Sequence, residues 1–274
     1  MILGALQGKR TKEKFLDSTI ITIIGVGFVF LMTTLGSAVV FLFKKNVSDK
    51  INSLLLGFAS GLMIAASIWS LILPSIEGAE SLGKWSFVPA TVGIIFGALF
   101  LILLDKLVQF IIKRKGKNGN GLTKPIKLFI AVTLHNIPEG LAVGLAFGNA
   151  IVASQISAFY SALWLAIGIG IQNFPEGAAL SLPIKDEYNS KKKGFLFGFA
   201  SGAVEPVMAV IGIFLSSVLS SIMSWLLAFS AGAMLFVVAE ELLPEAKFKS
   251  GAFVSTLGFI LGFVLMMILD VALG

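Results

Sequence analysis

Eight apolar stretches run along this chain, and each is long enough to cross a lipid bilayer. A spanning α-helix needs about 20 mostly apolar residues, and short breaks rich in charge, glycine or proline separate the stretches. They lie at about residues 19–43, 52–76, 87–112, 126–149, 154–182, 194–219, 222–244 and 252–272. The period-two alternation expected of a membrane β-barrel is absent from the sequence. We therefore predict an all-α membrane protein with eight transmembrane helices in a single domain, residues 1–274.

Composition narrows the chemistry that such a protein can perform. Charged residues make up 13% of the chain, against about 25% in ordinary soluble domains. Cysteine is absent and His135 is the single histidine, so thiolate sites are excluded and a metal site would use mainly oxygen ligands. The net charge of +6 arises from lysines and arginines between apolar stretches. No basic surface interleaved with aromatic residues is predicted, and hence no nucleic-acid partner.

The distribution of basic residues predicts the orientation in the membrane. Most lysines and arginines lie in the loops after the first, third, fifth and seventh stretches. Because short basic loops remain in the cytoplasm, we expect a multi-pass protein of the cell (plasma or inner) membrane with both termini outside. The basic residues before the first stretch, such as Lys9 and Arg10, oppose this assignment.

The second and seventh stretches resemble each other in sequence. Residues of FASGLMIAASIWSLILP recur in FSAGAMLFVVAEELLP at a constant offset of 171: Phe58, Gly61, Met63 and Leu71 match Phe229, Gly232, Met234 and Leu242. The predicted topology makes these two helices antiparallel. This favours a 3+2+3 arrangement with inverted repeats, which is common in secondary transporters. Chance matching between apolar helices is the alternative.

Three carboxylates lie well inside predicted helices: Glu139, Glu176 and Glu205. An ionisable residue at that depth costs about 2.5–3.5 kcal/mol on insertion scales, and it normally faces a partner or a cavity. Each of the three is adjacent to a proline, and the fourth and fifth helices share a Pro-Glu-Gly motif in HNIPEG (135–140) and QNFPEG (172–177).

Helical spacing places further polar side chains beside two of these carboxylates, because residues three or four positions apart share a face. The two sets are His135, Asn136 and Glu139 on the fourth helix, and Gln172, Asn173 and Glu176 on the fifth. We expect Gly140 and Gly177, just after the glutamates, to let these two helices approach closely.

Such a cluster predicts reversible metal binding at mid-membrane. Like charges in a low-dielectric cavity repel one another, and a divalent cation offsets that repulsion. Each element also has a simpler interpretation. An intramembrane histidine, asparagine or glutamine can bond a neighbouring helix, prolines kink membrane helices, and Met63 is typical core filler as well as a soft donor.

At these residues the sequence resembles the ZIP family of divalent-metal transporters, and its bacterial GufA-type branch in particular. The resemblance implies a two-site metal centre. One site would be lined by His135, Glu139, Gln172, Glu176 and Met63. The other would be lined by Asn136, Glu139, Asn173, Glu176 and Glu205, so that both Pro-Glu-Gly glutamates bridge the two metals. With asparagine at 173, the second site carries one charge fewer than in relatives that have aspartate there.

The predicted function is therefore a secondary transporter of Zn²⁺ or a similar divalent ion (Cd²⁺, Fe²⁺, Mn²⁺ or Co²⁺), with the metal as substrate and no cofactor. Transport toward the cytoplasm is implied by the resemblance, as is a homodimer, which is common in the family. The alternatives are an intramembrane metal-dependent hydrolase, although the H-E-x-x-H motif is lacking, and a carrier of protons or organic solutes that uses the same carboxylates.

Overall fold

The computed structural model describes residues 2–42, 48–115, 124–219, 222–250 and 252–273, without side-chain detail at some helical positions, including 2–17 and His135. The described residues form helices and short connections, with no strand among them. The first half contains α1 (Ile2–Leu42), α2 (Asp49–Ala66), α3 (Leu73–Glu77), α4 (Phe87–Lys115) and α5 (Lys124–Ala153). The second half contains α6 (Ile156–Glu187), α7 (Lys191–Gly202), α8 (Val204–Val218), α9 (Met223–Val237), α10 (Leu243–Ser250) and α11 (Ala252–Leu273).

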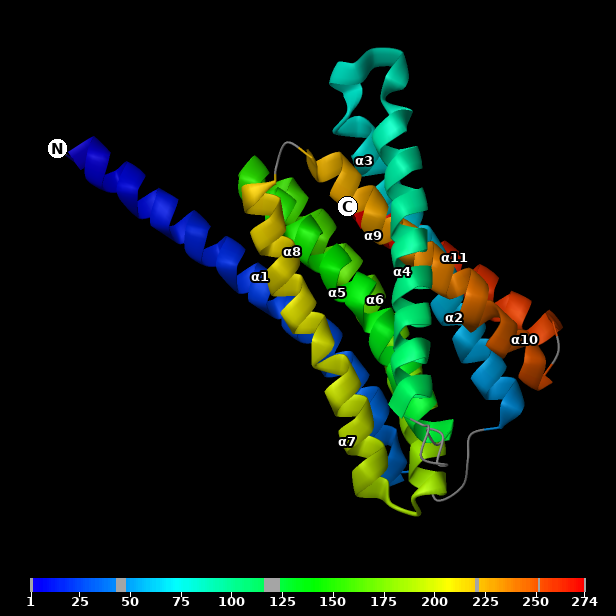
Figure 1. The fold of residues 1–274 in the computed structure, drawn as a ribbon. Coiled ribbons are helices and arrows are strands. Elements are labelled where there is room, and N and C mark those ends of the chain that lie inside the picture. Colours follow the sequence, from blue (N-terminus) through cyan, green and yellow to red (C-terminus); the bar gives the residue numbers. More distant parts are fainter. Residues whose placement is uncertain (1, 43–47, 116–123, 220–221, 251, 274) are drawn as a thin grey trace.

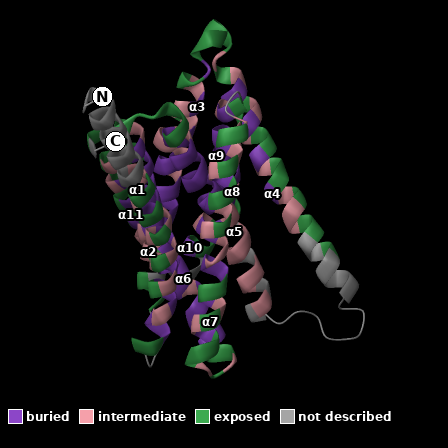
Figure 2. Cartoon of the chain, turned by 90° about the vertical axis from the view of Figure 1, so that its left-hand side faces the viewer, coloured by how far each residue is buried: buried purple, intermediate pink, exposed green. Residues whose placement is uncertain are grey.

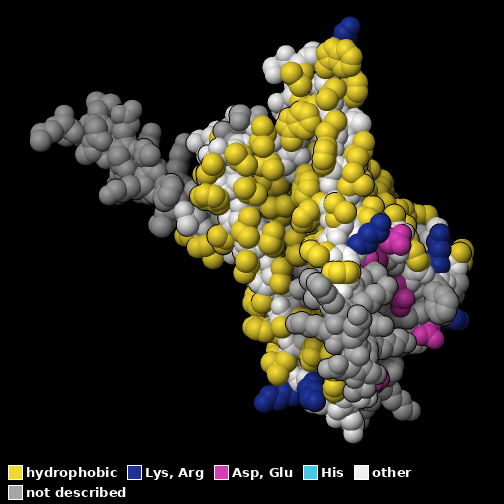
Figure 3. Space-filling model, viewed as in Figure 1, with side chains coloured by type: hydrophobic (Ala, Val, Ile, Leu, Met, Phe, Trp, Pro, Cys, Tyr) yellow, Lys and Arg dark blue, Asp and Glu magenta, His cyan; other side chains and the backbone are white. Residues whose placement is uncertain are grey.

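Eight helical segments in the described part of the chain are long and apolar enough to cross a membrane, which confirms the predicted class. They are Ser18–Leu42, Asp49–Glu77, Phe87–Leu107, Leu128–Ala153, Ile156–Glu187, Lys191–Val218, Met223–Lys247 and Ala252–Ala272. An apolar surface covers much of the face shown in Figure 3, as expected of a protein surrounded by lipid. The orientation of the two ends of the chain in the membrane stays a prediction.

The fourth and fifth spans, α5 and α6, occupy the middle of the bundle (Figure 1). They pack against each other, and each also has a second main neighbour: α8 for α5 and α1 for α6. The remaining long helices pair as α2 with α11 and α4 with α9. Buried residues gather where these helices face one another, whereas the outer face of α4 is largely exposed (Figure 2). Residues on α5 and α6 are therefore the ones best placed to form an enclosed site.

The second and seventh spans each change helical geometry near one end, which the sequence analysis did not predict. The π-helix η1 (Ser67–Ile72) interrupts the second span, and the π-helix η5 (Val238–Leu242) interrupts the seventh. A proline follows each of them, Pro74 in α3 and Pro244 in α10. π-Helical turns are rare and often occur at functional sites. Their presence at matching places in two spans adds to the similarity seen in the sequence.

Glycines bring two helix pairs into backbone contact at matching positions. A Cβ atom placed on Gly97 of α4 would lie 1.9 Å from the Phe229 carbonyl oxygen of α9. Likewise, a Cβ atom on Gly262 of α11 would lie 2.0 Å from the Phe58 carbonyl oxygen of α2. Phe58 and Phe229 are equivalent in the proposed repeat. The shared contact supports the repeat, while the complete 3+2+3 arrangement stays a prediction.

This packing makes Gly97 sensitive to the smallest substitution. We expect Gly97→Ala to lower the free energy of unfolding by about 1–3 kcal/mol, the usual cost of overpacking a tight contact. Gly27→Ala in α1 is the matched control, because nothing lies within 4 Å of a Cβ atom at Gly27. Thermal unfolding of the purified protein in detergent measures both variants. An equal melting temperature for the two would contradict the close approach of α4 and α9.

Candidate metal site

The three intramembrane carboxylates are buried and close to one another. Glu139 lies on α5, Glu176 on α6 and Glu205 in the first turn of α8. They are 0%, 5% and 1% exposed, respectively. Glu139 interacts electrostatically with both Glu176 and Glu205. The bundle therefore brings together charges from three helices that are far apart in sequence.

The position of Glu205 follows from a break in the sixth span. The sequence analysis treated residues 194–219 as one stretch, whereas α7 ends at Gly202 and α8 begins at Val204. Pro206 lacks the amide hydrogen that would bond to the Gly202 carbonyl in a continuous helix. Glu205 consequently lies at the start of a helix, where the helix dipole favours a negative charge.

Gln172 fixes one oxygen of Glu139. Its side-chain Nε2 donates a hydrogen bond of 2.8 Å to Glu139 Oε1, from α6 to α5. Because the carboxylate can only accept, the amide must turn its NH₂ group toward Glu139. The Gln172 Oε1 atom and the second oxygen of Glu139 then have no hydrogen-bond partner among the described residues.

Glu205 is held in the same way, but by two donors. Asn173 Nδ2 donates a 3.0 Å bond to Glu205 Oε1. The Thr33 hydroxyl on α1 donates to that same oxygen over 2.6 Å. Both donors act on one oxygen, so the other oxygen of the carboxylate is left free.

The free atoms on these residues are all oxygen acceptors. Six buried side-chain oxygens accept no hydrogen bond from any described residue: Glu139 Oε2, Gln172 Oε1, Asn173 Oδ1, Glu176 Oε1 and Oε2, and Glu205 Oε2. An unpartnered buried polar atom costs about 1–3 kcal/mol, and a whole group of acceptors is best satisfied by a cation. Among the described side chains, no three of the His, Asp or Glu type are arranged to hold a metal by themselves. The free amide oxygens of Gln172 and Asn173 are therefore candidate ligands beside the carboxylates.

Asn136, Met63 and His135 complete the set of predicted ligands. Asn136 is buried, and its Nδ2 donates a 3.1 Å bond to Ser201 Oγ on α7. Met63 is fully buried in the main hydrophobic cluster, so its interpretation as core filler stays open beside that as a ligand. His135 lies on α5, but its side chain is outside the described residues. The roles of these three residues as ligands stay predictions.

The two motif glycines make close contacts, but not the ones expected. We expected them to bring α5 and α6 together. Instead, a Cβ atom on Gly140 would lie 2.4 Å from the Glu205 carbonyl oxygen of α8, and one on Gly177 would lie 2.3 Å from the Thr33 carbonyl oxygen of α1. Each glycine thus joins its helix to an outer neighbour at the level of the carboxylates. The difference arises because the glycine faces of α5 and α6 are turned away from each other.

Thr33 is a residue that the sequence analysis missed. It lies inside the first apolar stretch, in the short polar run TTLGS at residues 33–37. Ser37, one helical turn later on the same face, donates to the Thr33 carbonyl and approaches the Gly177 carbonyl at 3.4 Å. The polar run was the available signal, but it did not indicate which helix these hydroxyls would meet.

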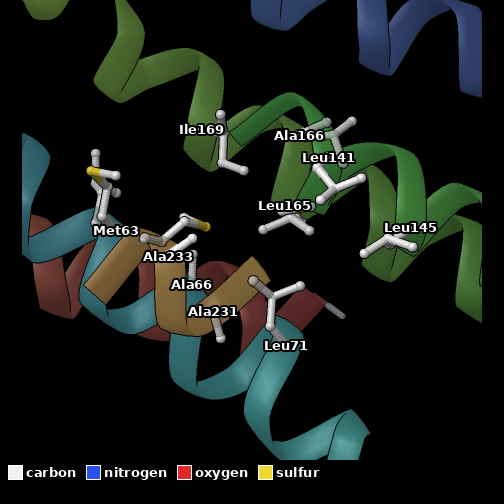
Figure 4. Close-up of a cluster of buried hydrophobic side chains, with 14 of the residues drawn as sticks. Met63, Ala66, Leu71, Leu141, Leu145, Leu165, Ala166, Ile169, Ala231 and Ala233 are labelled. Atoms are coloured by element: carbon white, nitrogen blue, oxygen red, sulfur yellow. The ribbon is translucent and has the colours of Figure 1, made fainter. Parts of the chain in front are cut away.

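Buried apolar side chains of several helices gather in one cluster (Figure 4). It contains Leu141 and Leu145, which follow Glu139 on α5, and Leu165 and Ile169, which precede Gln172 on α6. Small residues of α2 and α9 complete it, including Ala66, Ala231 and Ala233. Along α5 and α6, the three leucines and Ile169 lie between the carboxylates and the α5–α6 connection near Ser154.

Comparison with known proteins identifies the family. The family model described as ZIP Zinc transporter matches residues 120–270. The protein named Zinc transporter ZIP11 from Xenopus tropicalis is 34% identical over 328 residues, which cover 92% of this chain and 97% of that protein. Zinc transporter GufA from Myxococcus xanthus is 34% identical over 248 residues, with 88% and 94% covered. Because the family model matches over half of the chain and these relatives align along nearly all of it, the chain belongs to the ZIP zinc transporter family.

Proposed function

We propose that this protein is a secondary transporter that moves Zn²⁺, or a similar divalent transition metal, toward the cytoplasm through the site on α5, α6 and α8. The observation that carries the proposal is the group of buried, unpartnered oxygens on Glu139, Gln172, Asn173, Glu176 and Glu205. The two relatives described above are both named zinc transporters, which supports zinc as the substrate. They also favour a transporter over an intramembrane hydrolase.

Charge balance favours a divalent ion in this site. No described lysine or arginine forms an ion pair with any of the three glutamates, and the buried Lys185 pairs with its neighbour Asp186. A buried carboxylate without a counter-ion is costly. A bound divalent cation offsets two negative charges at once. When the cation leaves the site, the repulsion among the glutamates returns. Such a site can therefore both bind and release its ion.

The donor set allows several metals. Carboxylate and amide oxygens, with the imidazole of His135 as the predicted nitrogen ligand, accept Zn²⁺, Cd²⁺, Fe²⁺, Mn²⁺ and Co²⁺. Asn173 contributes a neutral oxygen, so the second of the two expected metal positions has less charge to hold an ion. We propose Zn²⁺ as the principal substrate on the basis of the relatives.

The direction of transport rests on the predicted orientation. With both termini outside, the α5–α6 connection lies outside as well, and the buried residues Leu141, Leu145 and Leu165 lie along α5 and α6 between the site and that connection. Because water and ions cross apolar side chains poorly, we propose that the ion leaves the site on the other side, toward the cytoplasm. The inverted repeats would provide the opposite state, as in other transporters built on that plan.

The first test removes the charge of one carboxylate at a time. Glu139→Gln and Glu176→Gln should each reduce Zn²⁺ uptake into proteoliposomes by more than about tenfold, since even outer-shell changes at metal sites cost 10–100-fold. Glu77→Gln is the matched control, because Glu77 is exposed at the end of α3 and its loss should leave uptake unchanged. Undiminished uptake by both site variants would refute the assignment. Saturable binding of metal by the unaltered protein separates this function from a proton or organic-solute carrier.

A second test strengthens one ligand. Gln172→His should tighten Zn²⁺ binding, because an imidazole can donate one N–H to Glu139 and ligate zinc with its other nitrogen. Gln155→His, placed before α6 at an exposed position, should leave the affinity unchanged. Calorimetric titration of the purified proteins measures both. Equal affinity of the Gln172 variant and the unaltered protein would argue that position 172 does not reach the metal.

A further inference from the structure

The Thr33 side chain on α1 makes an unusually specific contact with the site. It is 2% exposed, and its hydroxyl oxygen lies 2.6 Å from Glu205 Oε1 and 3.4 Å from the Val29 carbonyl oxygen. A hydroxyl has one proton to donate. The short distance and the charge of the acceptor identify Glu205 as its partner, because hydrogen bonds to carboxylates are the shorter and stronger ones.

The backbone around Thr33 holds this contact in place. Its carbonyl oxygen faces Gly177, where a Cβ atom would lie only 2.3 Å away, so α1 and α6 touch at this level. On the other side, its Cγ2 methyl packs on Gly202, at 2.8 Å from the Cβ position of that residue. Threonine is also stiff at χ1 because of its branched Cβ. The hydroxyl is therefore directed at Glu205 by packing on two sides.

Two donors on a single oxygen determine the orientation of the Glu205 carboxylate. Thr33 and Asn173 both bond Oε1, which fixes the plane of the group. The remaining oxygen, Oε2, is buried and accepts no hydrogen bond from a described residue. If the Thr33 bond were lost, the Asn173 bond alone would hold the carboxylate, which could then rotate. Metal affinity depends on such outer contacts that orient the ligands.

We propose that Thr33 is a positioning residue of the metal site, which holds Glu205 so that its free oxygen faces the ion. This inference rests on the proposed function, since it concerns the same site. It adds the first span to a centre otherwise built from α5, α6 and α8. In this role Thr33 acts on the ion only through Glu205, whose carboxylate its hydroxyl orients.

Paired substitutions at position 33 test the proposal. Thr33→Val keeps the branched shape but removes the hydroxyl. Thr33→Ala removes both the hydroxyl and the methyl group. Both should weaken Zn²⁺ binding by roughly 10- to 100-fold, the range found for outer-shell partners. Thr33→Ser keeps the hydroxyl but lacks the methyl that packs on Gly202, so it should bind Zn²⁺ more tightly than Thr33→Val and less tightly than the unaltered protein. Titration of the purified proteins with Zn²⁺ measures each affinity, and uptake into proteoliposomes measures transport.

Thr22→Val on the same helix is the matched control. Thr22 is also buried, but its hydroxyl donates only to the Ser18 carbonyl oxygen of its own helix, at 2.9 Å. This variant should bind Zn²⁺ like the unaltered protein. Unchanged affinity in Thr33→Val and Thr33→Ala, or equal loss in Thr33→Ser, would overturn the positioning role while leaving the transport function standing. Absence of saturable Zn²⁺ binding by the unaltered protein would overturn both proposals.

Discussion

The centre of this molecule depends on the cost of burying negative charge. Glu139, Glu176 and Glu205 are at most 5% exposed, and no described lysine or arginine pairs with them. Neutral donors hold one oxygen of Glu139 and one of Glu205 and leave the other oxygen free. Hydrogen bonds of this kind orient a carboxylate without removing its charge. Acidic groups that are buried and oriented but have no basic partner can exchange their protons for a cation, and this is the physical basis for carrying one.

Close helix packing gives these carboxylates their fixed places. Gly140 lets α5 meet the backbone of α8 at Glu205, and Gly177 lets α6 meet α1 at Thr33. In a membrane, small residues allow this approach because van der Waals contact drives helix association there. Each Pro-Glu-Gly motif therefore supplies both a charged group and, one residue later, the contact that positions its helix.

The two outer pairs of helices follow a common pattern. Gly262 packs on the backbone at Phe58, and Gly97 packs on the backbone at Phe229. The spans that carry these phenylalanines also turn π-helical shortly before a proline. Four matching residues in two apolar helices are weak grounds for a repeat. The same contacts and the same local distortion in both spans strengthen it, because chance similarity of composition would not reproduce them.

The sequence by itself determined the eight spans, because the thickness of the hydrocarbon layer sets the length and composition of each. It also indicated the three carboxylates, since charge in that layer is too costly to be incidental, and the residues that share a helical face with two of them. The tertiary structure decided which helix each side chain meets. Asn173 bonds Glu205, Gly140 packs on α8, and Thr33 enters from α1. Periodicity within one helix fixes its own faces, but the rotation and crossing of neighbouring helices, which decide these contacts, arise only when all of them pack together.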